Sequence, residues 1–188
     1  IRNVARANPN RTIRVGTGEV GDSLRFDPLF DLSRTLVEEL SDLDNVSFEL
    51  KTKTNYVDHL LGIPRKGNAI IGFSLNPEAF MFAEEGFAAT LDQRLAAARR
   101  ASDAGFSLAF HFDPIVAISG WREHYRSVVE RLSQFRQSDV AWISMGTMRY
   151  PTPLAPAIEA RPYGVGEFVR TGDGKFRYLQ AIRAGIYR

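Results

Sequence analysis

RVGTGEVGDSL (14–24) begins as an apolar, β-branched run and then meets Gly16 and Gly18, with Glu19 directly after the second glycine. It belongs to the first of five short runs rich in β-branched and aromatic residues: TIRVGT (12–17), VSFELKT (46–52), AIIGFSL (69–75), FSLAFHF (106–112) and VAWISMG (140–146). Most of these runs are followed by a helical pattern. Strand then helix, repeated, predicts right-handed βαβ units and a parallel sheet.

Helical patterns span residues 27–42, 55–62, 90–104 and 121–135. Asp27 is the expected N-cap of the first helix, Thr90 caps the third, and Gly105 is placed to end it. A complete eight-stranded barrel needs about 250 residues, and five strand–helix units with a tail fall short of that length. The pattern alone therefore fits a partial barrel or an open doubly wound sheet.

Composition narrows the class of protein. The 188 residues are 44% apolar and 24% charged, which is typical of a globular domain. Lys and Arg (24) exceed Asp and Glu (22) by only two, so net charge is weak evidence for nucleic-acid binding. Cysteine is absent, which excludes disulfides, thiolate metal sites and a cysteine nucleophile from this stretch. No apolar run approaches a membrane span of about 18 residues, and with no export signal we favour the cytoplasm.

Every predicted strand ends in polar residues, and in parallel α/β folds ligands bind at that edge. Taken singly, each has a plain structural explanation: a solvated loop carboxylate, an exposed lysine, a core histidine. Together they predict a small-molecule site. GTGEVG matches GxGxxG literally, but Glu19 would face a pyrophosphate, so we discount a dinucleotide fingerprint. The three histidines lie on three segments with no metal-ligand spacing, and no metal is expected.

Several segments, in order, resemble the spore photoproduct lyase family of radical S-adenosylmethionine enzymes. They are KTNYVDHLLG (53–62), GFSLNPE (72–78), RLAAARRASDAGFSLAFHFDPI (94–115), GWREHYRSVVERL (120–132) and DGKFRYLQAIRAGIYR (173–188). The resemblance implies an α/β fold: a partial (β/α)6-type TIM barrel with a parallel sheet, whose first βα unit is missing from this chain. It also implies a [4Fe-4S] cluster whose CxxxCxxC ligands lie upstream of Ile1, so we expect the 188 residues alone to be inactive.

The same resemblance implies that the chain binds S-adenosylmethionine. A Gly-Gly-Glu-like motif follows the second strand of such enzymes and holds the amino end of the methionine moiety, and GTGE (16–19) sits at that place. Lys53 and Ser74 match positions that help bind the cofactor's carboxylate and ribose. The residues expected at the cofactor are Thr17, Gly18, Glu19, Lys53, Ser74, Asn76 and His111.

One departure concerns Thr17, which stands nearest to the hydrogen-donating cysteine of true spore photoproduct lyases. An O–H is a far poorer hydrogen-atom donor than an S–H, so we interpret the chain as a paralogue with an unknown substrate. We expect a barrel domain over 1–149 and, over 150–188, an irregular segment and a basic amphipathic helix that packs on or extends the barrel. TGDG (171–174) is a turn signal, and the helix is expected over KFRYLQAIRAGIY (175–187). That tail could instead contact DNA, so a nucleic-acid-binding protein and a non-catalytic barrel stay open as alternatives. The oligomeric state is not predicted.

Overall fold

The computed structural model describes residues 1–17, 21–161, 168–178 and 183. The chain divides into two compact units, one of residues 1–111 and 134–143, the other of 112–133 and 144–188. Each unit is described by itself. Because the division interleaves the chain, the expected boundary between 149 and 150 stays a prediction.

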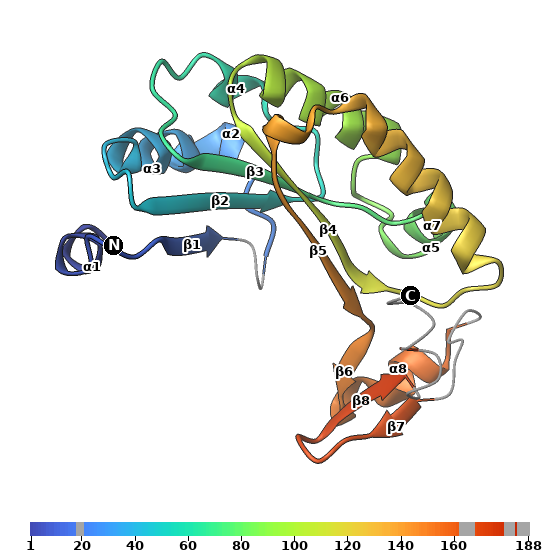
Figure 1. The fold of residues 1–188 in the computed structure, drawn as a ribbon. Helices are drawn as coiled ribbons and strands as arrows, with labels where there is room; N and C mark the ends of the chain where they lie inside the picture. The colour runs from blue at the N-terminus through green and yellow to red at the C-terminus, as the bar shows by residue number, and fades with distance from the viewer. Residues whose placement is uncertain (18–20, 162–167, 179–182, 184–188) are drawn as a thin grey trace. The chain divides into compact units, whose positions relative to one another are not determined.

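A five-stranded sheet in the order β1-β2-β3-β4-β5 organises the first unit (Figure 1). The strands are β1 Ile13–Thr17, β2 Val46–Thr52, β3 Ala69–Ser74, β4 Ser107–Ile115 and β5 Val140–Thr147. The strands β1 to β4 pair in parallel with their neighbours, so the predicted parallel sheet is confirmed. The prediction ended the fourth strand at residue 112, whereas β4 continues to Ile115 and places His111 within the strand.

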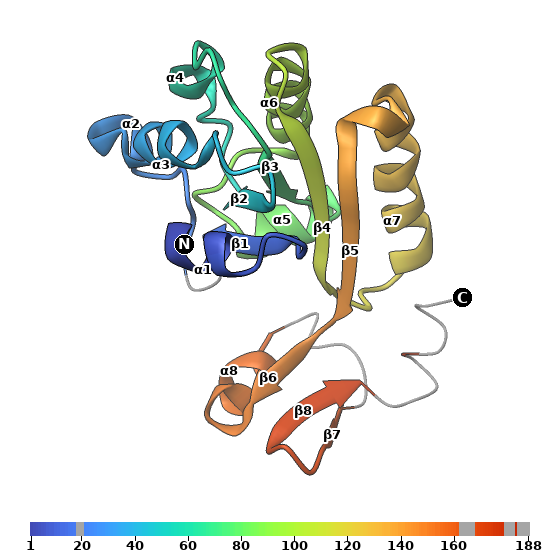
Figure 2. The same ribbon diagram turned by 60° about the vertical axis from the view of Figure 1, so that its left-hand side comes forward.

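Helices and short 3-10 turns connect the strands. They are α1 Arg2–Ala7, α2 Asp27–Phe30, α3 Leu32–Leu40, α4 Asp58–Leu61, α5 Glu78–Glu84, α6 Leu91–Asp103, α7 Trp121–Glu130, η1 Arg131–Gln134 and η2 Gln137–Asp139. In Figures 1 and 2, α3, α4 and α6 lie on one face of β2 and β3. That face supplies the apolar core, with Phe48, Leu50, Ile71, Phe73 and Leu108 almost completely buried.

The helix ends follow local sequence chemistry. Thr90 caps α6 through a capping box: its hydroxyl accepts from the Gln93 amide, and the Gln93 side chain accepts from the Thr90 amide. Gly105 follows with φ +91°, the left-handed conformation that glycine adopts without steric cost. The helix predicted over 27–42 is instead two helices, because Asp31 has φ 51°.

The opposite face of the sheet is concave and polar. Residues alternate between faces along a strand, and the register pairs Gly16 with Glu49 and Ser74 with His111. The Arg14 guanidinium lies 3.9 Å from the centre of the Trp142 ring, although β1 and β5 are at opposite edges of the strand order. Side chains from both edges can meet only if the sheet curls, so the partial barrel is confirmed as a half-barrel.

A three-stranded sheet of order β6-β8-β7 lies in the second unit, with β6 Arg149–Pro151, β7 Phe168–Arg170 and β8 Lys175–Tyr178. The 3-10 helix η3 Thr152–Leu154 and helix α8 Ala155–Glu159 follow β6. Lys175–Tyr178 was predicted to begin a helix and is a strand instead, because the TGDG turn joins it to β7 as a hairpin and its aromatic side chains alternate. Arg183 apart, the remainder of that predicted helix lies outside the described residues.

Candidate ligand site at the strand ends

Lys53, directly after β2, is paired with an acidic side chain that the sequence did not single out. Its Nζ donates to Glu85 Oε1 at 2.7 Å, and Glu85 Oε2 accepts from Arg94 at 2.5 Å. The Glu85 side chain is 6% exposed and that of Arg94 is fully buried, whereas Lys53 remains 43% exposed. Glu85 and Arg94 are therefore shielded from solvent, whereas the Lys53 ammonium is accessible to solvent and ligands.

The pKa of Glu85 reflects these neighbours. Burial raises the pKa of the carboxyl, but the charge of Arg94 and the hydrogen bonds from Lys53 and Arg94 outweigh burial and hold it below its usual value. Glu85 is therefore ionised at neutral pH. The Arg94–Glu85–Lys53 cluster carries two positive charges and one negative charge, a net charge of +1.

Ser74 and Asn76, at and after the end of β3, lie beside this cluster and are almost completely buried. The Ser74 carbonyl accepts from Arg94 Nη1 at 2.7 Å, and Asn76 Nδ2 donates to Glu85 Oε1 at 3.4 Å. The structure therefore brings Lys53, Ser74 and Asn76 together around Glu85 and Arg94. That these residues contact a cofactor stays a prediction.

His111 belongs to a second group, on the concave face. Its Nε2 lies 2.5 Å from Glu49 Oε1, and both side chains are nearly buried. Gly72, on the strand between them, makes this pair possible: a Cβ there would lie 2.3 Å from Glu49 Oε1. The Glu49 carboxylate passes over Gly72, which has no side chain to obstruct it, and so reaches His111. The predicted contact of His111 with a cofactor is not tested.

Thr17 closes β1, and its hydroxyl is occupied by neighbours within the protein. Oγ1 lies 2.7 Å from Ser23 Oγ and donates to the Glu49 carbonyl at 3.3 Å. Gly18 and Glu19 lie outside the described residues. Their proposed contact with the amino end of a methionine moiety therefore stays a prediction.

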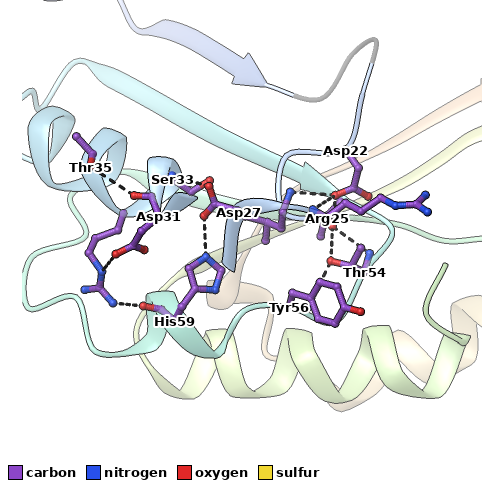
Figure 3. Close-up of polar contacts among 12 residues, drawn as sticks. Asp22, Arg25, Asp27, Asp31, Ser33, Thr35, Thr54, Tyr56 and His59 are labelled. Atoms are coloured by element: carbon purple, nitrogen blue, oxygen red, sulfur yellow. Dashed lines mark hydrogen bonds and ion pairs between the residues drawn. The ribbon is translucent and has the colours of Figure 1, made fainter. Parts of the chain in front are cut away.

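Asp22, in the segment after β1, is bonded to the end of β2 (Figure 3). Its Oδ1 accepts from the amides of Leu24 and Arg25, both at 3.0 Å, and from Thr52 Oγ1 at 2.7 Å. Its Oδ2 accepts from the Lys53 amide at 2.6 Å. Asp22 therefore fixes the backbone from which the Lys53 side chain projects.

Two cavities flank Glu85 and Gly86. The larger, about 390 Å³, is mainly apolar and is bounded by α5 and the start of α6. The smaller, about 250 Å³, is lined by three carboxylates, two cations and four neutral residues: Asp22, Glu84, Glu85, Arg25, Lys53, Thr54, Gly86, Phe87 and Ala88. The partly exposed Lys53 ammonium borders this space.

A third polar group joins α2 to α4 (Figure 3). Ligand-type atoms of Asp27, Asp31 and His59 lie within 4.8 Å of one another. The atoms already have partners: Asp27 Oδ2 lies 2.7 Å from His59 Nε2, Asp27 Oδ1 accepts from the Ser33 amide at 2.9 Å, and Asp31 pairs with Arg34. We interpret this group as a clamp between helices.

The fold and the Arg94–Glu85–Lys53 cluster define a class of protein: an α/β half-barrel whose polar residues gather at the carboxyl ends of its strands. A sequence model described as spore photoproduct lyase matches residues 3–155. The chain belongs to the spore photoproduct lyase family.

Curated relatives agree with this assignment. Spore photoproduct lyase of Bacillus subtilis (strain 168) is 31% identical over 186 residues, covering 88% of this chain and 54% of that protein. The enzyme of the same name from Geobacillus sp. is 28% identical over 188 residues, covering 89% of this chain and 55% of that protein. The chain therefore spans about half the length of the curated relatives it matches.

Solved structures support the fold. A spore photoproduct lyase complexed with dinucleoside spore photoproduct has a TM-score of 0.83 at 23% identity, and the match covers 99% of this chain and 58% of that one. A mutant spore photoproduct lyase with bound AdoMet and the same dinucleoside also has a TM-score of 0.83, at 22% identity and the same coverage.

Among the residues that the structure describes, no helix combines the length and the apolar character that a membrane span requires.

Proposed function

We propose that this chain is the S-adenosylmethionine-binding part of a radical enzyme. The observation that carries the proposal is the grouping of Lys53, Ser74 and Asn76 around the Glu85–Arg94 pair. The partly exposed Lys53 ammonium, held by the buried Glu85–Arg94 pair, is suited to bind a ligand carboxylate, because a charge-assisted hydrogen bond is stronger than a neutral one. Family membership and the AdoMet bound in a similar solved structure support the choice of this cofactor.

The residues present fit S-adenosylmethionine but not an iron–sulfur cluster. Lys53 would hold the cofactor's carboxylate, with Ser74 and Asn76 beside it and Thr17, Gly18, Glu19 and His111 as further candidates. When bound to a reduced cluster, this cofactor supplies a radical for chemistry on a substrate. The 188 residues contain no cysteine, so no step of that chemistry is assigned to a cluster on this chain.

We propose DNA as the partner of the second unit. Arg149 pairs with Arg177 across β6 and β8, and Pro151 pairs with Lys175, so the three cations share one face of the small sheet. Such a face is suited to phosphates. The dinucleoside spore photoproduct bound in a similar solved structure belongs to the same chemical class as DNA. Thr17 in place of cysteine favours a substrate or route that differs from theirs.

Equilibrium dialysis with S-adenosylmethionine tests the proposal. Binding by the full chain, and a loss of at least about tenfold in affinity for Lys53→Met, is expected from the removal of a charge-assisted hydrogen bond. Lys66→Met is the matched control, since that ammonium donates to the Ile63 carbonyl elsewhere. Equal losses in both variants would contradict the site.

For the DNA proposal, the affinity for a short single-stranded oligonucleotide should fall as salt rises, and the Lys175→Ala variant should show a shallower slope. A slope that this substitution leaves unchanged would contradict a contact between the small sheet and phosphates.

A further inference from the structure

Glu85 is the carboxylate of the Arg94–Glu85–Lys53 cluster, and it is the C-cap residue of α5 rather than part of a strand. It contacts Lys53, Asn76 and Arg94 at once. We propose that Glu85 is a positioning residue: it holds the Lys53 ammonium at the strand ends so that the remaining N–H donors of Lys53 face a ligand carboxylate. This inference rests on the proposed function and assigns a role to a residue outside the predicted cofactor contacts.

Glu85 cannot simply leave Lys53 to make room for a ligand, because Arg94 holds it. The Arg94 side chain is fully buried, and Nε donates to the Ala89 carbonyl at 3.0 Å and Nη1 to that of Ser74 at 2.7 Å. Both carbonyls are neutral, so Glu85 supplies the negative charge that this guanidinium contacts. Removing the partner of a buried charge is strongly destabilising. Arg94 therefore holds the Glu85 carboxylate in a fixed position.

Lys53 is the partly exposed member of the pair. Its ammonium has three N–H donors, and one of them is committed to Glu85. Its stem starts from backbone that Asp22 and the Ala89 amide hold in place, the latter through the Lys53 carbonyl at 3.0 Å. With both stem and head restrained, a ligand carboxylate meets an ordered donor and does not have to order a flexible lysine itself.

The charge count supports the same reading. Arg94 and Lys53 share the single carboxylate of Glu85, so the charge of Lys53 is compensated only in part by that carboxylate. The smaller cavity is also lined by Asp22, Glu84 and Arg25. A ligand carboxylate would complete the balance of the Arg94–Glu85–Lys53 cluster. A ligand without a carboxylate would gain nothing from the Lys53–Glu85 contact, and this difference separates positioning from general structural support.

The experiment compares two ligands on the full chain by equilibrium dialysis: S-adenosylmethionine and its decarboxylated analogue. Glu85→Gln should weaken binding of S-adenosylmethionine about fivefold, the effect of one partly exposed ion pair, and should leave the decarboxylated analogue unchanged. Glu78→Gln is the matched control, because it makes the same charge change on α5 at an exposed position. Glu85→Asp keeps the charge beside Arg94 and provides a second variant if Glu85→Gln unfolds.

A double-mutant cycle with Lys53→Met completes the test. If Glu85 acts through Lys53, then Glu85→Gln should have no further effect on affinity in the Lys53→Met background. Unchanged or tighter binding by Glu85→Gln, equal losses for both ligands, or additive losses in the cycle would each overturn the inference. Failure of the unmutated chain to bind S-adenosylmethionine contradicts the proposed function itself, whereas binding without a Glu85 effect contradicts only the positioning role.

Discussion

Gly72→Ala should destabilise the first unit because the new methyl group would collide with the Glu49–His111 pair. The added Cβ would lie 2.3 Å from Glu49 Oε1 and 3.0 Å from His111 Nε2, well inside contact distance. Glu49 cannot yield without stretching its 2.5 Å contact with His111. Overpacking of this kind costs about 1–3 kcal/mol, which corresponds to about 2–4 °C in Tm per kcal/mol for a chain of this size.

Urea unfolding followed by tryptophan fluorescence measures this effect. The chain has two tryptophans, so a Trp121→Phe background leaves Trp142, within the first unit, as the reporter. Gly16→Ala is the matched control, since its Cβ would meet Glu49 Oε2 at an ordinary 3.9 Å. In a Glu49→Ala background the cost of Gly72→Ala should fall to a few tenths of a kcal/mol. An undiminished cost there would refute the clash as the cause.

Three further predictions concern stability. The folded-state pKa of Glu85 lies below the ordinary pKa of a glutamate, so its stabilising effect is complete above that ordinary value and is lost as the pH falls through the lower folded value. Acid titration of the unfolding free energy should therefore show a shallower loss for Glu85→Gln than for the parent chain. Asp27→Ala removes both the His59 contact and the cap on the Ser33 amide, and should cost about 1–3 kcal/mol in urea unfolding, whereas the exposed Asp92→Ala should cost far less. Thr90→Ala should cost about 1 kcal/mol, and Thr90→Ser should recover most of it; equal losses in the two variants would contradict the capping box.

Local patterns predicted the elements of this fold well. The five strands follow β-branched runs, and the cap and stop of α6 are readable as Thr90 and Gly105 because both act within a few residues of themselves. The prediction of one continuous helix over 27–42 was wrong because of contacts with residues distant in the sequence. The predicted N-cap role of Asp27 was also wrong, because Asp27 is the first residue of α2 and Phe26 is the N-cap. The Asp27 side chain instead accepts from the Ser33 amide in α3 and contacts His59, and the break at Asp31 allows it to do both.

The charged pairs of the site could not be predicted in the same way. Strand ends pointed to Lys53, Ser74 and Asn76, but Glu85 and Arg94 sit on helical segments and read as solvent-facing charges. The Glu49–His111 contact joins residues 62 positions apart, across β3. A buried carboxylate in a strand was the one available signal, since such a residue needs a partner, yet nothing in the sequence says which strand supplies it.

Gly72 explains how the concave face can be polar and still packed. A carboxylate that must reach across a neighbouring strand needs a residue without a side chain beneath it, and Gly72 fulfils that need for Glu49. The middle of the face is thereby filled by a paired carboxylate and imidazole rather than kept open. The net positive charge of the Arg94–Glu85–Lys53 cluster lies beyond the strand ends, where Lys53 contacts Glu85 and Glu85 contacts Arg94. We therefore expect ligand recognition at that edge, because the Glu49–His111 pair is buried whereas the Lys53 ammonium is partly exposed and shares its partner Glu85 with Arg94.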